Sequence, residues 1–177
     1  MRDDRRGSGG AVRCLRPDLI VRSIHDLDYD ALHRQGVLAL LYDLENTLCR
    51  WRDWQLDART RALLRRLQDQ GLRIAVLTNA RVPPQHPLVL EMEELGIPVV
   101  ASARKPFRQS FRRTLALLGV SPAQAAMIGD QVLTDVLGGR RAGMYTVLVE
   151  PVAHDESRPT KVNRWVERRL VRRIPAA

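Results

Sequence analysis

Residues 37–48 read VLALLYDLENTL, an apolar run that ends in two carboxylates, Asp43 and Glu45. The run from Val37 to Tyr42 is apolar without alternation, which predicts a strand buried on both faces. Side chains two residues apart on an extended chain point the same way, so Asp43 and Glu45 are expected to face one site. Two carboxylates held that close need a cation or a shared proton. The end of this strand is therefore the first candidate site.

Similar runs follow along the rest of the chain, and they alternate with segments of helical spacing. The predicted strands cover residues 37–42, 73–77, 98–101, 125–128 and 145–149, and the predicted helices cover 26–35, 57–70, 87–95, 107–118 and 132–142. Strands that alternate with helices favour a mainly parallel sheet covered on both faces, a three-layer α/β/α sandwich. Ligands of such sheets bind beyond the carboxyl ends of the strands. The strand ends are thus where functional residues are expected.

The charge balance favours an anionic partner. The 177 residues include 29 Lys and Arg against 20 Asp and Glu, a net charge of +9. Nucleic acid, an acidic membrane surface or a phosphorylated substrate would each suit this balance. Two cysteines give no disulfide framework, and neither a signal peptide nor a long apolar segment is visible. We therefore expect a cytoplasmic protein, or one that lies peripherally on the inner face of the membrane.

We divide the chain into three parts. Residues 1–16 are predicted to be a flexible basic lead-in, residues 17–157 the folded domain, and residues 158–177 a basic helix or tail of that domain. The C-terminal part has apolar and basic residues at helical spacing, which is typical of a helix at a membrane interface. Packing of this helix on the sheet, with a solvated charged face, is an equal alternative. For the segment from Arg50 to Trp54, lipid contact and packing into the core both stay open.

Four strand ends carry polar residues. The first leads into Asp43, and the second into Thr78 and Asn79. The third is followed by Lys105, and the fourth by the Gly129–Asp130 pair, with Asp135 five residues on. Each of these residues, taken alone, can also be interpreted as a helix cap, a turn residue or a solvated charge. The occurrence of these residues together, at four successive strand ends, indicates an enzyme of phosphoryl transfer.

The residue types suit the hydrolysis of a phosphate monoester. Asp43 and Asp130 are candidate ligands of Mg²⁺, which would bridge carboxylates and an anionic phosphate. Asp43 could attack phosphorus as a nucleophile, and Glu45 could protonate the leaving oxygen and then activate water. Lys105 would offset negative charge, and Thr78 would donate a hydrogen bond to a phosphoryl oxygen.

With these residues in place, the sequence resembles the haloacid dehalogenase (HAD) superfamily of phosphatases, in particular its type III, YqeG-like branch. The resemblance runs from LRPDLI near residue 15 through DLENTL, TN, ARKPF and IGDQVLTDVLGGRRAG to VNRWVERRL near the end. It implies a Rossmann-like sheet, a required Mg²⁺ and an aspartyl phosphate at Asp43. The short segments between Asp43, Thr78 and Lys105 leave no room for a large cap domain. The metal would be held by Asp43, Asp130 and the backbone carbonyl of Glu45.

The resemblance also gives expectations for neighbouring residues and for the substrate. Asp135, Asn46 and Thr47 would support the site, while Thr78, Asn79 and Lys105 would bind the substrate. Because related organellar proteins are phosphatidylglycerophosphate phosphatases, we expect this phosphorylated lipid as the substrate.

One departure from the family pattern keeps alternatives open. The second acid of the DxDxT motif is usually Asp, whereas this chain has Glu45, which is one methylene longer. A displacement near 1 Å can lower a rate about a hundredfold. The alternatives are a phosphatase of a soluble metabolite or protein, and a catalytically weakened protein that binds RNA or ribosomes through its basic surface.

Overall fold

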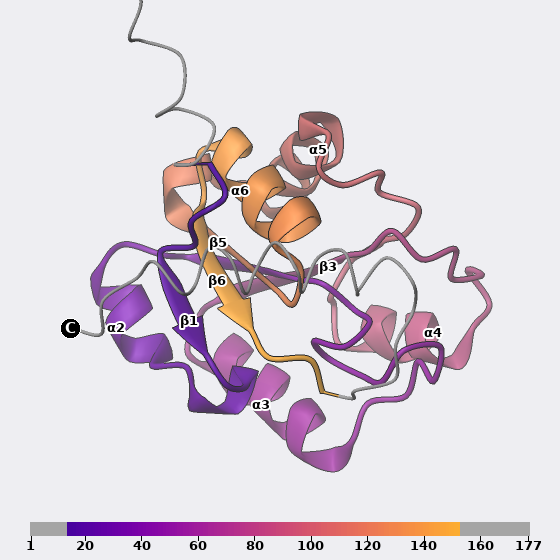
Figure 1. The fold of residues 1–177 in the computed structure, drawn as a ribbon. Coiled ribbons are helices and arrows are strands. Elements are labelled where there is room, and N and C mark those ends of the chain that lie inside the picture. The colour runs from indigo at the N-terminus through magenta and orange to yellow at the C-terminus, as the bar shows by residue number, and fades with distance from the viewer. Residues whose placement is uncertain (1–13, 153–177) are drawn as a thin grey trace, which may run out of the picture.

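A computed structural model describes residues 14–152, which form a parallel sheet between layers of helices (Figure 1). The strands are β1 (Leu19–Val21), β2 (Ala39–Tyr42), β3 (Arg73–Leu77), β4 (Val99–Val100), β5 (Ala125–Gly129) and β6 (Tyr145–Val149). Their order in the sheet is β1-β6-β5-β2-β3-β4, and every neighbouring pair is parallel. The predicted Rossmann-like α/β sandwich is confirmed.

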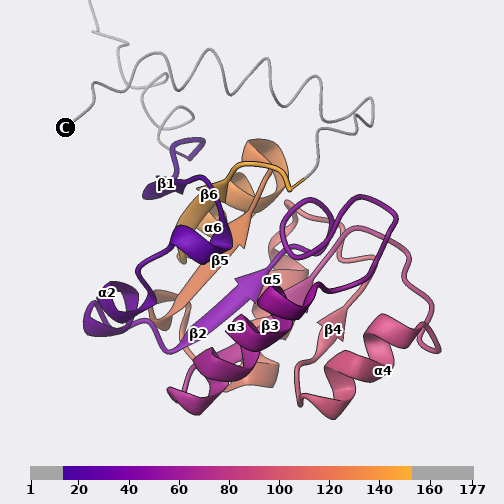
Figure 2. The ribbon, with the colours of Figure 1, turned by 90° about the horizontal axis from the view of Figure 1, so that it is seen from below.

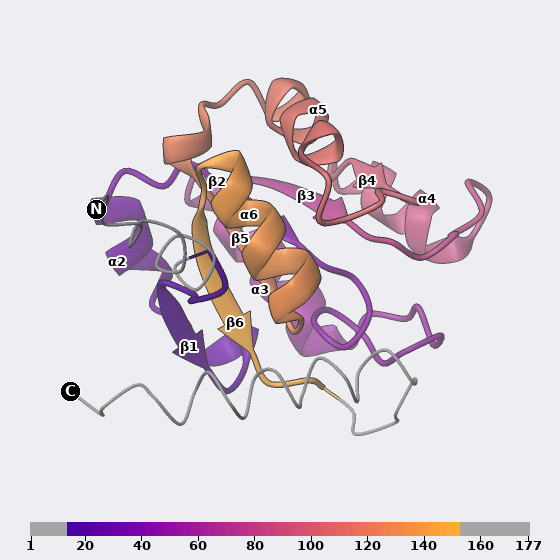
Figure 3. The same ribbon diagram turned by 45° about the horizontal axis from the view of Figure 1, so that its top comes forward.

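Helices cover both faces of this sheet. One face carries α5 (Arg108–Leu118) and α6 (Leu137–Ala142), which lie together in front of the strands in Figure 3. The other carries α2 (Tyr29–Arg34), α3 (Ala58–Asp69) and α4 (Pro87–Glu94); in Figure 2, α3 lies in front of the central strands and α4 lies beside the edge strand β4. The short turns are η1 (Ile24–Asp26), η2 (Pro122–Gln124) and η3 (Val132–Val136), the last a π-helix. Within residues 14–152, none of the helices combines the length and the apolar character needed to cross a bilayer.

The central strands are apolar throughout because they fill two cores at once. In β2, Leu40 and Tyr42 join the core under α2, α3 and α4, whereas Ala39 and Leu41 join the core under α5 and α6. Successive strand residues point to opposite faces, so a strand buried on both faces needs apolar residues at every position. This continuous burial fixes the strand ends, and with them the residues that follow.

Helix α6 contains two adjacent glycines because it packs very closely on its neighbours. A Cβ at Gly138 would overlap the ring of Phe111 on α5. A Cβ at Gly139 would lie 2.8 Å from Thr146 Cγ2 and 2.9 Å from Met127 Cβ. Both glycines are buried. The helix tolerates the low helix propensity of glycine because only glycine permits this approach to β5 and β6.

Several element boundaries differ from the sequence-based predictions. The helix predicted from residue 26 begins at Tyr29, because the Asp28 carboxylate accepts a hydrogen bond from Ala31 N (2.8 Å) and caps it there. The strand predicted from Val37 begins at Ala39. The segment predicted as one helix over 132–142 opens with the π-helical turn η3 before α6.

The edge strand β1 was not predicted. It is three residues long and pairs with β6, with Leu19 opposite Val147 and Val21 opposite Val149. Residues just before β1 also contact the domain, since Arg16 O accepts a hydrogen bond from Arg140 Nε (3.0 Å). The proposed boundary at residue 157 and the basic C-terminal helix over 158–177 lie outside the described residues.

Candidate active site

Three aspartates come together at the carboxyl edge of the sheet. Strands β2 and β5 are neighbours, with Tyr42 opposite Ile128, so Asp43 and Asp130 leave the sheet side by side. Asp135 reaches them from the π-helical turn η3. Each aspartate offers a carboxylate oxygen, and these oxygens all lie within 4.8 Å of one another. The exposed fractions are only 5%, 3% and 0% for Asp43, Asp130 and Asp135.

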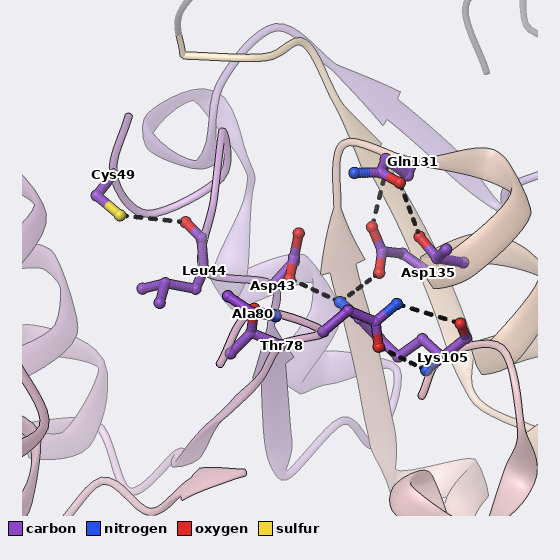
Figure 4. Close-up of polar contacts among 10 residues, drawn as sticks. Asp43, Leu44, Cys49, Thr78, Ala80, Lys105, Gln131 and Asp135 are labelled. Carbon is purple, nitrogen blue, oxygen red and sulfur yellow. Dashed lines mark hydrogen bonds and ion pairs between the residues drawn. The ribbon is translucent and has the colours of Figure 1, made fainter. Parts of the chain in front are cut away.

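Lys105 joins two of these carboxylates. Its Nζ lies 2.7 Å from Asp43 Oδ1 and 2.7 Å from Asp135 Oδ1, as Figure 4 shows. Burial opposes the charge of the ammonium group, but Asp135 and Asp43 outweigh burial and raise the pKa of Lys105 above its usual value. Lys105 is therefore a buried cation fixed between two acids that the sequence places 92 residues apart.

The backbone of Lys105 is held by Asn79. The side chain of Asn79 accepts a hydrogen bond from Lys105 N (2.7 Å) and donates one to Lys105 O (3.2 Å). The loop after β4 also pairs with the loop after β3, since Ala103 N donates to Thr78 O (2.9 Å). These bonds explain how a lysine that follows the two-residue strand β4 reaches the aspartates. In the structure, then, the Asn79 side chain supports Lys105.

Asp135 is fixed by the residues around the Gly129–Asp130 turn. Its Oδ2 accepts a hydrogen bond from Gln131 N (3.1 Å), and a Cβ at position 129 would overlap its carboxylate. Burial, with the Asp43 charge nearby, raises the pKa of Asp135 to about 6 despite the opposing Lys105. Gly129 is thus required by packing, since the carboxylate of Asp135 occupies the place that a side chain would take.

The arrangement fits a divalent cation. Three ionised carboxylates with one ammonium group would carry a net charge of −2 in a buried place. Carboxylate oxygens are hard ligands, which suit hard cations of the Mg²⁺ and Ca²⁺ type. Buried carboxylates of this kind require a positive partner or protonation. The structure brings the acids at 43 and 130 together, and Asp135 adds a third carboxylate oxygen to the group.

Comparison with known proteins identifies the family. A model of the HAD-hydrolase-like family matches residues 102–168. A protein of Bacillus subtilis (strain 168) named "Probable phosphatase YqeG" is 34% identical over 155 residues, which cover 88% of each chain. The chain belongs to the YqeG-like branch of the HAD superfamily. It is a phosphatase of the HAD type.

Other relatives agree with this assignment. "Phosphatidylglycerophosphate phosphatase 1, chloroplastic" of Chlamydomonas reinhardtii is 31% identical over 150 residues, covering 81% of this chain and 56% of the algal protein. This chain therefore spans little more than half of that relative. Among solved structures, the cobalt-bound deoxy-D-mannose-octulosonate 8-phosphate phosphatase of Haemophilus influenzae superposes with a TM-score of 0.52 at 17% identity, covering 73% of this chain and 75% of the other. That likeness concerns the fold alone.

Glu45 of this HAD phosphatase does not lie in the acidic group. Its Oε1 accepts hydrogen bonds from Arg52 N (3.1 Å) and Trp54 Nε1 (3.0 Å). The expectation that its side chain would face one site together with Asp43 assumed an extended chain, but the strand ends at Tyr42 and Asn46 has a left-handed φ of 61°. The longer side chain of glutamate is thus held at the rim of the HAD site by the loop over residues 50–54.

Of the remaining predicted residues, Asn46 and Thr47 belong to the loop of the HAD motif, and Thr78 lies at the end of β3. Asn46 is buried; its N donates to Cys49 O (2.7 Å) and its O accepts from Val152 N (2.9 Å), which ties the loop to the end of β6. Thr47 is buried as well. Thr78 is buried at the end of β3, and its Oγ1 accepts a hydrogen bond from Ala80 N (3.1 Å), which leaves the hydroxyl proton available.

Two residues near the HAD site were not assigned a role from the sequence. Gln131 supplies the N–H that fixes Asp135. Because Gln131 directly follows the Gly129–Asp130 pair, its backbone N–H could have been considered as a hydrogen-bond donor to a carboxylate of the site. Trp54 was considered only for lipid contact or core packing. Trp54 packs partly against the core and also donates a hydrogen bond from Nε1 to Glu45. No periodic pattern in the sequence predicts this hydrogen bond.

Proposed function

We propose that this HAD phosphatase is a Mg²⁺-dependent phosphomonoesterase that converts phosphatidylglycerophosphate to phosphatidylglycerol. The observation that supports the chemistry best is the buried group of Asp43, Asp130 and Asp135 with Lys105 between two of its members. The lipid substrate is supported by the relatives named phosphatidylglycerophosphate phosphatase, from Chlamydomonas reinhardtii and Arabidopsis thaliana, at 31% and 26% identity.

Asp43 is the proposed nucleophile. A carboxylate oxygen of Asp43 attacks phosphorus, the bond from phosphorus to the substrate oxygen breaks, and an aspartyl phosphate forms. Glu45 gives its proton to the departing alcohol oxygen. Glu45 then takes a proton from water, the water oxygen attacks phosphorus, and phosphate leaves as the Asp43 carboxylate is restored. The two half-reactions return both residues to their starting state.

The other residues bind and orient the phosphoryl group. Lys105 keeps its positive charge beside Asp43 and offsets the charge of the phosphoryl oxygens. Thr78 donates its free hydroxyl proton to one of these oxygens. Asn79, through its bonds to the Lys105 backbone, keeps the lysine in place, and its proposed contact with substrate would add to that role. Asp43, Asp130 and the Glu45 carbonyl would hold Mg²⁺ with support from Asp135, and the ion would neutralise charge at the reacting phosphate.

A lipid phosphate suits the open edge of the sheet. The connection from β2 to β3 contains α3 and the one from β3 to β4 contains α4, so neither has room for a large cap domain. Such a cap would exclude water from a small substrate. A phosphate presented by a bilayer needs open access, and the net charge of +9 favours an anionic surface.

Release of phosphate from phosphatidylglycerophosphate in detergent micelles tests this function. We expect turnover with Mg²⁺, none with excess EDTA, and recovery when Mg²⁺ is restored. Asp43→Asn removes the nucleophile and should abolish release, whereas the exposed Asp69→Asn on α3 should leave the rate unchanged. Wild-type protein that releases no phosphate from any phosphomonoester with Mg²⁺ would contradict the proposal.

A substrate panel separates the alternatives. Phosphoserine and sugar phosphates should react more slowly than the lipid, and a higher kcat/KM for one of them would assign a soluble substrate instead. Glu45→Asp restores the usual family residue. A large gain in rate from this substitution would mark the native chain as catalytically weakened, whereas little change would indicate that Glu45 is fully competent in its loop.

A further inference from the structure

A basic surface with one exposed aromatic ring lies where β4 leads into α5. We define this β4–α5 surface by Arg104, Phe107, Arg108 and Arg113, which line a shallow hollow of about 590 Å³. The other residues that line the hollow are uncharged: Val100, Ala101, Ser102, Ala103, Gln109 and Ser110. The hollow thus carries three positive charges and no negative one.

The three arginines have no counter-charge among the described residues 14–152. None of Arg104, Arg108 and Arg113 forms an ion pair in the part of the chain that the structure describes. All three are exposed. By contrast, Arg61 and Arg140 pair with Glu91 and Asp18. A cluster of unpaired arginines without acids is complementary to an anionic partner.

Phe107 gives this surface an apolar tip. Its side chain is 65% exposed, the largest exposed fraction among the large apolar residues of the described part of the chain. Phe107 precedes the first turn of α5, and its carbonyl accepts a hydrogen bond from Ser110 Oγ (3.2 Å), so its backbone is fixed while its ring is free. An aromatic ring flanked by arginines is typical of residues that enter the boundary between lipid headgroups and acyl chains.

The β4–α5 surface adjoins the active site. Arg104 directly precedes Lys105, whose Nζ contacts Asp43 and Asp135. Phe107 and Arg108 stand at the start of α5, at the carboxyl edge of the sheet, whereas Leu117 stands at the other end of this helix. A bilayer in contact with Phe107 would therefore face the edge of the sheet that carries the aspartates.

We infer that the β4–α5 surface docks this phosphatase on a bilayer that contains anionic phospholipid. The inference rests on the proposed lipid substrate and names the residues that bring the site to it. The arginines contact headgroup phosphates, and the Phe107 ring enters the interface. A lone exposed ring beside scattered arginines suits a bilayer better than single-stranded nucleic acid, which stacks its bases on several aromatic side chains.

Flotation with vesicles measures the contribution of the surface. An arginine at an anionic bilayer surface contributes about fivefold in partition, so Arg108→Gln with Arg113→Gln should weaken binding about 25-fold. Adding Phe107→Ser should weaken it about tenfold more. These substitutions keep good helix formers on α5 and place a preferred N-cap residue before it, so the fold should persist. Vesicles of phosphatidylcholine alone should bind all variants weakly.

A matched variant controls for the loss of charge. Arg65→Gln with Arg66→Gln removes two exposed arginines from the second half of α3, which packs on the opposite face of the sheet from α5. Residues 158–177 are identical in both double variants. Any contribution of these residues to vesicle binding therefore cancels when the binding constants of the two variants are compared. Equal losses of vesicle binding in the two double variants would show a general charge effect and would overturn the inference.

A fluorescent label tests insertion directly. In a Cys14→Ser background, an environment-sensitive dye at Phe107→Cys should shift to the blue when vesicles with phosphatidylglycerol are added. The same dye at Leu117→Cys, also exposed at 58%, should not shift. Cys49 is buried and stays unlabelled. No shift at position 107, or an equal shift at both positions, would overturn the inference.

The outcomes separate the surface from the substrate. Inactivity toward the lipid in micelles, with the predicted blue shift intact, would refute the substrate and retain the docking surface. Activity in micelles that the arginine substitutions leave unchanged, with activity on vesicles reduced through a higher apparent KM, supports both. Weaker binding of single-stranded RNA by the Arg108 and Arg113 variant, with vesicle binding unchanged, would assign the surface to nucleic acid instead.

Discussion

At the scale of single residues, the position of Lys105 explains how three carboxylates coexist in one buried place. Each of Asp43, Asp130 and Asp135 is at most 5% exposed, and a buried charge without a partner is strongly unfavourable. Lys105 contacts two of them at 2.7 Å, and the net negative charge of the whole group suits one divalent cation. We therefore expect catalysis and metal binding to depend on this lysine in opposite ways.

Lys105→Met should separate these two effects. Activity should fall about a hundredfold or more, because the phosphoryl oxygens lose a cationic partner. The metal-free protein should lose about 3–5 kcal/mol of unfolding free energy, because two buried carboxylates lose their cationic partner. Mg²⁺ should then stabilise the variant more than the wild type, since the acidic group is more negative. Thermal unfolding with and without Mg²⁺ measures this difference, with Arg65→Met as the exposed control.

A Mg²⁺-induced rise in melting temperature that is smaller in Lys105→Met than in the wild type would contradict this account. Such a result would mean that the main effect of Lys105 on metal binding is to hold the carboxylates in position, and that its competition with the metal is the smaller effect. The control variant at Arg65 should match the wild type in both activity and melting temperature.

The contact between Trp54 and Glu45 gives a second residue-scale prediction. Trp54→Phe removes the N–H that bonds to Glu45 Oε1 and keeps an aromatic ring. If Glu45 protonates the leaving oxygen, hydrolysis of alkyl phosphates should slow about tenfold, within the usual range for general acid catalysis. The first turnover of p-nitrophenyl phosphate, whose leaving group needs little protonation, should change much less, because it precedes the step in which Glu45 activates water.

Trp51→Phe is the matched control for this experiment, since Trp51 lies in the same loop and contacts the Arg52 guanidinium instead. The rates for both substrates should stay at the wild-type level in this variant. Equal slowing of the first turnover of both substrates in Trp54→Phe would instead show that the tryptophan acts by packing and not through Glu45.

Residue types and spacing predicted much of the acidic group but not its rim. Asp43, Asp130 and Lys105 follow strands of a parallel sheet, so their convergence was predictable from the alternation of strands and helices. The direction of Glu45 was not, because it depends on a left-handed φ at Asn46 and on hydrogen bonds from Arg52 and Trp54. Such loop conformations have no periodic pattern in the sequence.

At the scale of elements, the long buried strands were predictable and the short edge strand was not. Strand β5 is buried at all five positions and is apolar except for its final glycine, whereas β1 has three residues, of which the middle one is exposed. Strand β1 is held through its flanks: Asp18 accepts hydrogen bonds from Thr146 N (2.9 Å) and Thr146 Oγ1 (3.0 Å), and it pairs with Arg140. Contacts between residues 128 positions apart leave no local signal.

Close packing of α6 gives an element-scale prediction. Gly139→Ala would raise helix propensity by about 1 kcal/mol, but its Cβ would lie within 3 Å of Thr146 and Met127. Overpacking of this kind costs about 1–3 kcal/mol, and the contacted atoms belong to strands that cannot shift freely. Denaturant unfolding should therefore show a net loss of stability. Arg141→Ala, at an exposed position of the same helix, should stay within about 0.5 kcal/mol of the wild type.

At the scale of the whole molecule, the catalytic loop is built into the larger core. Leu44, Leu48 and Cys49 are 0%, 3% and 3% exposed and belong to the cluster that also contains residues of α2, α3 and α4. Cys49 Sγ contacts Leu44 O at 3.5 Å (Figure 4). The loop after β2 is therefore expected to open only when the domain unfolds, which distinguishes it from a mobile surface loop.

Thiol labelling tests this coupling. Burial, followed by the nearby Glu45 charge, raises the pKa of Cys49 to about 12. A raised thiol pKa means less thiolate at a given pH, so at about pH 8 about one Cys49 thiol in ten thousand would be ionised even if reagent could reach it. Cys14 is partly exposed and should react with iodoacetamide in the native protein, whereas Cys49 should not.

Denaturant dependence of the Cys49 reaction then measures how the loop opens. If the loop moves only with the domain, the free energy of opening from the labelling rate should equal the global free energy of unfolding and show the same denaturant slope. A Cys14→Ser variant isolates the Cys49 signal without touching the core. Labelling of Cys49 at a much lower free energy, with a shallow slope, would show that the loop opens locally. In that case the burial of Asp43 beside Lys105 would be transient, and the acidic group would be assembled by the substrate and metal instead of by the fold.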